Sequence, residues 1–383
     1  PFIAMAGDPT SDVALPPDPS HVVPRLLSWG IVSVVVALLH NRLWASPNLD
    51  AFSRIADRLG SDPFSDASTS DYLLTNLSMP ALARAVGLTD PHRYALLHVI
   101  VLLVGCGCCV ALAQRHFGYR AARTLLVLLA ASPGVTVVLQ WLGQPDALTF
   151  PLGIALVLVR RRGSLVALAV LAGLAHPEQA VLVVACAAVV RGWVTPPGTY
   201  FDLPVTRPGW RRLPGLVIGD LGWGLLGVAL ARLAIELYLR GFGIGLGRPR
   251  SDYLRLGADL LVEHHGRAPL SLVYLLWGPL WLVVIAAVAL RVAAALRPGK
   301  DRYAWSWAVL GALSLTALVP VAVTLDETRV YAVLTAPVLA GAAVVLSREL
   351  VALHHRGLAI GTGALLAVTL VVPGGFTAGE DAW

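Results

Sequence analysis

The sequence predicts an all-α membrane protein, a polytopic bundle of about ten to eleven transmembrane helices. Hydrophobic residues make up 57% of the 383 residues, charged residues only 14%, and the mean hydropathy is +0.72. Soluble domains hold roughly 25% charged residues, so this composition suits a lipid solvent. The apolar residues also gather in runs that approach the length of about 20 residues needed to cross a bilayer as a helix.

Backbone polar groups cannot face lipid without partners, so each apolar run is expected to be a helix or a break that other helices bury. The run at 164–190 is predicted to be a broken hairpin, because Pro177 removes a backbone donor between His176 and Glu178. The runs lie at about 26–46, 94–114, 122–142, 146–159, 164–190, 214–239, 269–296, 303–324, 329–347 and 357–373. Residues 1–24 are predicted to be a disordered cytoplasmic tail, 25–373 the transmembrane domain, and 374–383 a C-terminal tail.

Basic residues gather in the short connections between these runs, and such loops stay on the cytoplasmic side. With 164–190 as a hairpin, all the basic clusters fall on one side of the membrane. The net charge of +6 comes from these flanking residues rather than from a stripe, so we expect no nucleic-acid partner. The clusters are Arg115, Arg120 and Arg123; Arg160–Arg162; Arg191, Arg207, Arg211 and Arg212; Arg297, Lys300 and Arg302; and Arg348, His354, His355 and Arg356.

Most acidic residues fall on the opposite, extracytoplasmic side. The first outer loop, 47–93, shows apolar residues at helical spacing and is predicted to form two short amphipathic helices on the membrane surface. A second large outer loop spans 241–268. The ionisable chemistry of the chain is therefore expected at one membrane face.

Asp50 follows the first span almost immediately. A carboxylate at the boundary between membrane and water can take a proton from an acceptor hydroxyl, which makes Asp50 a candidate general base. The alternative is structural, because aspartate is also a favoured N-cap of a helix.

Two further candidates lie in tight connections. Asp146, after Gly143-Gln144-Pro145, either caps the next helix or binds substrate hydroxyls. His176 and Glu178 lie in a helix break at membrane depth, where polar residues are costly unless they pair with each other or act on a ligand.

Arg329 opens the ninth run and is a candidate phosphate ligand, since its planar donors match a phosphate; the alternative is an ion pair with Asp326 or Glu327. Asp326 itself is a candidate substrate-binding residue. Arg255, in the outer loop 241–268, is a second basic candidate for an anionic headgroup. No metal site is predicted, because His264-His265 has no clear third ligand.

Together these features resemble the GT-C superfamily of integral-membrane glycosyltransferases, and most closely its bacterial mannosyltransferase-like branch. The shared features are an acidic first outer loop with surface helices, a Gly-Gln turn after the third span, and a broken hairpin before a basic loop. The matching stretches read Gly143-Gln144-Pro145-Asp146, Arg160–Arg162 and Gly173-Leu174-Ala175-His176-Pro177. The resemblance covers most of the topology of 25–373.

The resemblance implies a polyprenyl-phosphate sugar donor, a lipid or glycan acceptor, and membrane lipids as surroundings. It implies that the donor phosphate lies near Arg329, His176 and Arg255, with Asp50 as general base and inversion at the anomeric carbon. No cofactor is expected; a metal-independent reaction is favoured and a role for a divalent cation stays open. It further implies a multi-pass protein of the bacterial inner membrane with an extracytoplasmic active site.

The chain departs from the family pattern at two positions. His176 stands where the pattern has a lysine before proline, and an imidazole attracts phosphate only when it is protonated. Asp50 has no adjacent second carboxylate, which favours a monophosphate-linked donor over a metal-dependent diphosphate donor.

Three other readings fit the same pattern. A transporter or flippase of a lipid-linked or anionic solute would share the broken hairpin and the outer arginines. An O-antigen ligase or polymerase would use arginines in the outer loop 241–268. A structural subunit of a membrane complex would leave the acidic residues as solvated loop charge.

Overall fold

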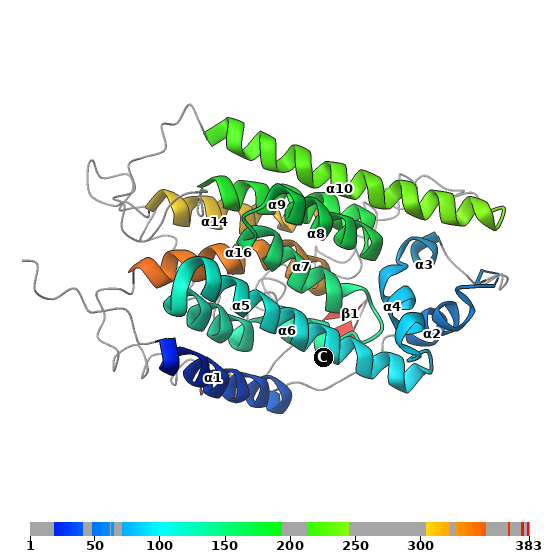
Figure 1. Cartoon of the computed structure of the whole chain (residues 1–383), viewed down its shortest axis with the longest axis horizontal. Helices are drawn as coiled ribbons and strands as arrows, with labels where there is room; N and C mark the ends of the chain where they lie inside the picture. Colours follow the sequence, from blue (N-terminus) through cyan, green and yellow to red (C-terminus); the bar gives the residue numbers. More distant parts are fainter. Residues whose placement is uncertain are drawn as a thin grey trace, which may run out of the picture.

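The computed structural model of the chain is an all-α fold, as the sequence predicts (Figure 1). A pair of two-residue strands, β1 (Thr377–Ala378) and β2 (Asp381–Ala382), is antiparallel. Helices at Pro91–Ala131, Gly215–Gly241 and Thr328–Arg348 are long and apolar enough to cross a membrane. The structure describes residues 19–40, 48–61, 63–64, 71–193, 213–244, 304–321, 327–349, 367, 377–378 and 381–382.

The helices follow the predicted apolar runs. The first, α1, begins at Pro19, earlier than the boundary at residue 25 that the sequence suggested. The predicted run at 269–296 lies outside the described residues, and so does 357–373 apart from residue 367. The helices of the bundle are α1 (Pro19–His40), α5 (Pro91–Ala131), α6 (Pro133–Gln140), α7 (Asp146–Leu158), α8 (Arg162–Ala175), α9 (Pro177–Trp193), α10 (Leu213–Gly241), α14 (Ala304–Thr316), α15 (Leu318–Val321) and α16 (Glu327–Glu349).

Helix α5 contains the predicted span 94–114 and the first part of the span 122–142, which is broken at Ser132 and continues in α6. Its helical geometry is interrupted at Gly118, where φ is +82°, a conformation that favours glycine. Near this kink, the Arg160 guanidinium lies 4.8 Å from the centre of the Phe117 ring. The kink therefore lies at the same end of the bundle as the basic turn 160–162, as the arginine pattern predicts.

The predicted broken hairpin is present at the predicted position. Helix α8 ends at Ala175, His176 is extended with φ −159° and ψ 95°, and α9 begins at Pro177. Proline suits the first turn of a helix because the missing N–H has no intrahelical partner there. The two helices pack against each other and against α10.

Three short helices, α2 (Leu49–Arg58), α3 (Asp71–Thr75) and α4 (Ser78–Val86), gather at the other end of the bundle, beside the C-terminal end of α10 (Figure 1). Their apolar side chains form a separate core with Tyr94, Ile235 and Leu239. Backbone N–H of Leu77 donates to the carbonyl of Leu174 at 3.1 Å, which fixes α4 to the end of α8. We call this end the α2–α4 end.

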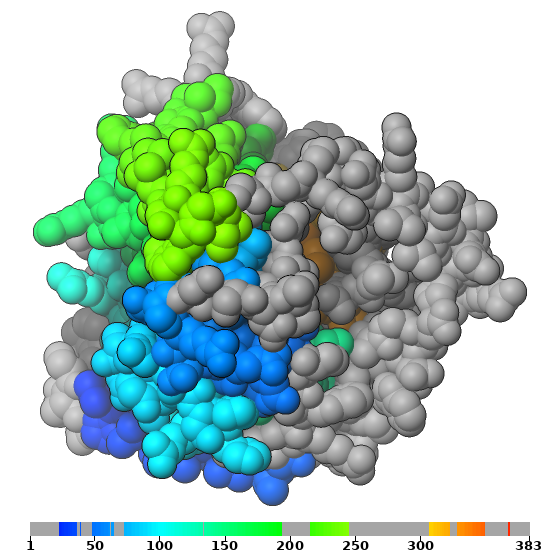
Figure 2. Space-filling view, turned by 90° about the vertical axis from the view of Figure 1, so that its right-hand side faces the viewer, coloured from blue at the N-terminus to red at the C-terminus, as the bar shows by residue number. Residues whose placement is uncertain are grey.

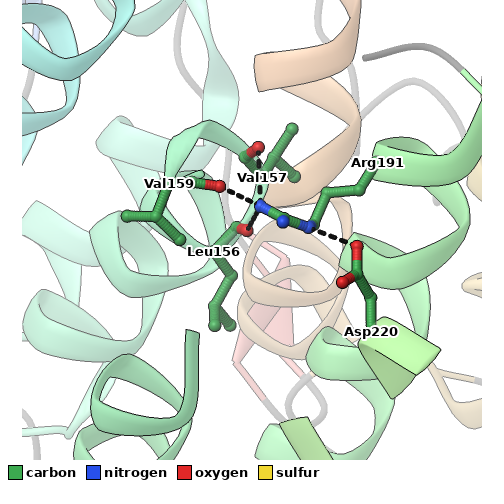
Figure 3. Close-up of polar contacts among 5 residues, drawn as sticks. All are labelled: Leu156, Val157, Val159, Arg191 and Asp220. Carbon is green, nitrogen blue, oxygen red and sulfur yellow. Dashed lines mark hydrogen bonds and ion pairs between the residues drawn. The ribbon is translucent and has the colours of Figure 1, made fainter. Parts of the chain in front are cut away.

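At the opposite end, a buried arginine joins three helices (Figure 3). Arg191 of α9 donates through Nη1 to the carbonyls of Leu156 at 3.1 Å, Val157 at 3.4 Å and Val159. Its Nε donates to Asp220 Oδ2 of α10 at 2.8 Å. Carbonyls at the end of a helix lack intrahelical partners, so this guanidinium satisfies the end of α7 while it fixes α7, α9 and α10 together.

We predict that Arg191→Lys lowers the free energy of unfolding in detergent by about 1–3 kcal/mol, because an ammonium cannot reach both the carbonyls and Asp220 in one geometry. Thermal unfolding of the purified protein measures this. The control is Arg232→Lys, since Arg232 pairs at 2.9 Å with Glu236 one turn away on α10, and both side chains are 36% exposed. Equal losses in the two variants would contradict the role assigned to Arg191.

Candidate functional site

The turn between α6 and α7 packs directly against the start of α2. Gly143 in this turn has φ +100°, and a Cβ there would lie 2.9 Å from the Cα of Leu49. Both the conformation and the close approach require glycine. The backbone of Gln144 also interacts with the buried imidazole of His98 on α5. The Gly-Gln turn is therefore where α2, α5 and α7 meet.

This contact places Asp50 beside the turn. Asp50 lies in the first turn of α2, where a carboxylate interacts favourably with the helix dipole, and its side chain is exposed between the buried Leu49 and Phe52. The N-cap position belongs to Asn48, so Asp50 does not cap this helix. The structural alternative, in which Asp50 is the N-cap of the helix, is therefore wrong, and Asp50 lies in the first turn of α2.

A buried ion pair lies at the start of α7, directly after the same turn. Arg329 Nε of α16 is 3.2 Å from Asp146 Oδ2 of α7. Asp146 is 0% exposed and Arg329 is 4% exposed. The guanidinium carbon of Arg329 also lies 5.8 Å from the centre of the Trp141 ring. Of the two roles expected for Asp146, capping of α7 is wrong, because Pro145 holds the N-cap position and Asp146 is paired with Arg329. Binding of substrate hydroxyls stays a prediction.

The pair links two helices that are far apart in the sequence, and sequence reasoning did not connect them. The available signal was that two opposite charges open apolar runs on the same predicted side of the membrane. Charges this deeply buried are costly unless paired, so each side chain requires the other.

We predict that Asp146→Ala and Arg329→Ala each lower the free energy of unfolding by about 3–5 kcal/mol, because each leaves an opposite charge buried. The double variant is expected to lose less than the sum of the two, which a double-mutant cycle of thermal unfolding measures. The exposed pair Asp57–Arg84, with side chains 65% and 53% exposed and 3.8 Å apart, is the control. Its cycle should give a coupling close to zero; additive losses for Asp146 and Arg329 would show that they do not interact.

His176 occupies the break between α8 and α9 and is 5% exposed. Its Nδ1 accepts a hydrogen bond from the backbone N–H of Gln179 at 3.4 Å and lies 3.4 Å from Glu178 Oε2. Its side chain therefore caps α9, and its imidazole has a carboxylate beside it. Glu178 is half-buried, with 40% of its side chain exposed.

Helices α7, α9 and α16 meet at Gly153. A Cβ on Gly153 would lie 3.2 Å from Ala336 Cβ and 3.2 Å from Val183 Cγ1. Small residues allow such close approach of membrane helices. We call this place the Gly153 junction. All three helices run from the α2–α4 end towards the opposite end.

The Gly153 junction shows which faces of α7, α9 and α16 pack against one another. Residues seven apart lie on one face of a helix, about two turns from each other. Asp146, His176 and Arg329 are each seven residues before the three residues that meet at the junction. The faces that bear them are therefore the faces that pack together, and the Asp146–Arg329 contact shows this directly for two of them.

The remaining sequence candidates are not placed. Arg255 and Asp326 lie outside the described residues. Among the described ranges, no group of three His, Cys, Asp or Glu residues could hold a metal ion. Sequence reasoning also did not single out three residues near the site that have buried polar side-chain atoms, Trp141, Thr149 and Gln179. Their side chains show no charge pattern, so only the packing reveals them.

We predict that Gly143→Ala costs more stability than Gly87→Ala. Both glycines have positive φ, +100° and +72°, so both alanines are strained by about 1–2 kcal/mol. At Gly87 nothing lies within 4 Å of the added Cβ, whereas at Gly143 the backbone of Leu49 lies 2.9 Å away. Thermal unfolding compares the two variants; equal losses would contradict the close packing of α2 on the turn.

The fold and these polar residues define an all-α membrane protein with its candidate site at one end of the bundle. No family model and no curated protein matches the chain. It is similar to solved structures of the Archaeoglobus fulgidus oligosaccharyltransferase, in the complex with Zn and sulfate and in the apo form. Each has 13% identity to this chain and a TM-score of 0.49. The match to the Zn and sulfate complex covers 93% of this chain and 53% of that protein, and the match to the apo form covers 92% and 54%. The chain thus spans about half the length of that protein, and no residue role is taken from it.

Proposed function

We propose that the chain is a membrane glycosyltransferase that moves a sugar, mannose, from a polyprenyl-phosphate donor to a lipid or glycan acceptor. The observation that supports this most is the Gly143 turn, which packs against Leu49 next to Asp50 and leads directly into the buried Asp146–Arg329 pair. A carboxylate at the surface and a guanidinium behind it are the two charges that sugar transfer from a phosphate requires. The resemblance of the Gly-Gln turn and the broken hairpin to the GT-C superfamily points the same way.

In the proposed reaction, the acceptor hydroxyl attacks the anomeric carbon from the face opposite the phosphate. Asp50 takes the hydroxyl proton while the new C–O bond forms. The bond between the anomeric carbon and the phosphate oxygen breaks, and the phosphate leaves with the electron pair. The anomeric configuration is inverted, and no oxidant, reductant or cofactor is required.

Arg329 is proposed to stabilise the charge that grows on the leaving phosphate, so that it binds the transition state more strongly than the ground state. Burial strengthens this effect, because a charge in a poorly polarisable environment interacts more strongly than in water. Asp146 positions the guanidinium from α7. His176, Glu178, Arg255 and Asp326 are proposed to line the donor and acceptor sites.

The active site is proposed to face the extracytoplasmic side of the bacterial inner membrane. The basic residues Arg160 and Arg191 lie at the end opposite to α2–α4, and positive loops stay in the cytoplasm. The donor lipid and the acceptor would then meet at the membrane surface beside α2.

We predict that Asp50→Asn lowers the rate of mannose transfer by about 10²–10⁴, because the amide cannot accept the proton of the acceptor. The assay incubates the purified protein with labelled polyprenyl-phosphate mannose and extracted glycolipids. Asp57→Asn is the matched control, since Asp57 is an exposed carboxylate on the same helix.

Near-normal turnover in Asp50→Asn would remove Asp50 from this role. Movement of the labelled lipid across a vesicle membrane without a new glycosidic bond would instead identify a transporter or flippase. Loss of activity with a chelator would identify metal-dependent chemistry with a diphosphate donor.

A further inference from the structure

Two buried polar side chains lie one turn from the candidate site, between it and the Gly153 junction. Thr149 is three residues after Asp146 and four before Gly153, so it shares their face of α7. Gln179 is four residues before Val183, so it shares the face of α9 that carries Val183, and its backbone N–H donates to His176 Nδ1. Both faces meet at the junction, where Gly153 contacts Val183.

The two side chains are almost fully buried, at 3% exposed for Thr149 and 5% for Gln179. Among the described residues, Thr149 Oγ1 and Gln179 Oε1 have no hydrogen-bond partner. Buried polar atoms are nearly always bonded, so two such atoms on facing helices indicate that something else bonds them. The matching position on α16 is the small residue Ala332, which leaves the polar groups to α7 and α9.

Thr149 and Gln179 differ in chemistry from the charged residues Asp146 and Arg329, which lie one helical turn closer to the α2–α4 end. A threonine hydroxyl and a glutamine amide are neutral, and each can both donate and accept. Hydroxyl groups of a sugar do the same, whereas a phosphate only accepts hydrogen bonds and attracts positive charge. Asp146 and Arg329, one turn away, provide the charges.

We propose that Thr149 and Gln179 bind hydroxyl groups of the sugar in a glycosyl phosphate whose phosphate lies at Arg329. This rests on the proposed function and identifies the residues that select the sugar. Seen from the α2–α4 end, orange atoms of the C-terminal part of the chain are visible near the blue atoms of the first helices (Figure 2).

The test compares two lipids that differ only in the sugar: polyprenyl-phosphate mannose and polyprenyl phosphate. Thr149→Val and Gln179→Leu are expected to weaken binding of the first by about 3–10-fold each, as expected for one lost hydrogen bond, and to leave binding of the second unchanged. Melting temperature is measured in parallel without ligand. It should stay equal or rise, because each variant replaces an unbonded buried polar group with an apolar one of similar shape.

The control is Thr335→Val. Thr335 is buried on α16, but its hydroxyl donates to the Tyr331 carbonyl of its own helix at 2.8 Å, so its loss should not discriminate between the two lipids. If the wild-type protein binds and transfers mannose but Thr149→Val and Gln179→Leu bind it equally well, the sugar-binding role is wrong while the proposed function holds. If either variant lowers both affinities and the melting temperature, that residue is structural. If the wild type neither binds the mannosyl lipid nor transfers mannose, the proposed function itself fails.

Discussion

The ion pair between Asp146 and Arg329 is the constraint on which the candidate site depends. Two charges that are 0% and 4% exposed are costly inside a membrane protein unless they are paired, and these two pair with each other. Their contact fixes the start of α7 against the start of α16, at 3.2 Å between Oδ2 and Nε. Two other described candidates are placed relative to these helix ends: Asp50 through the Gly143 turn, and His176 through α9, which packs on α7.

Two glycines, Gly143 and Gly153, allow the close packing of helices on which the candidate site depends. At the α2–α4 end, Gly143 admits the backbone of Leu49. Two turns deeper, Gly153 admits α9 and α16. Arg191 then holds α9 to the far end of α7, so the relative position of these two helices is fixed at both ends. A fixed frame of this kind suits a site whose groups come from four separate helices, because catalytic geometry tolerates little displacement.

Charged and neutral polar side chains lie at different distances from the α2–α4 end. Asp50 lies exposed at the surface, the charged pair lies buried behind it, and neutral Thr149 and Gln179 lie one turn deeper. A ligand with a sugar and a phosphate has the matching combination of neutral hydroxyls and negative charge. Buried polar groups are rare in membrane proteins, because each one costs free energy when it has no hydrogen-bond partner. Thr149 and Gln179 bring two such groups to the faces of α7 and α9 that pack together.

The sequence alone determined the all-α class, the approximate positions of most described helices and the break at His176-Pro177. These depend on local properties: apolar run length, proline chemistry and the clustering of arginines. It also singled out Asp146 and Arg329 separately, because charges at the ends of apolar runs are conspicuous. Only the tertiary structure decided that they pair, that Asn48 rather than Asp50 holds the N-cap of α2, and that Thr149 and Gln179 face one junction. Contacts between distant helices depend on how their faces pack, and the spacing of residues along one chain does not specify which faces meet.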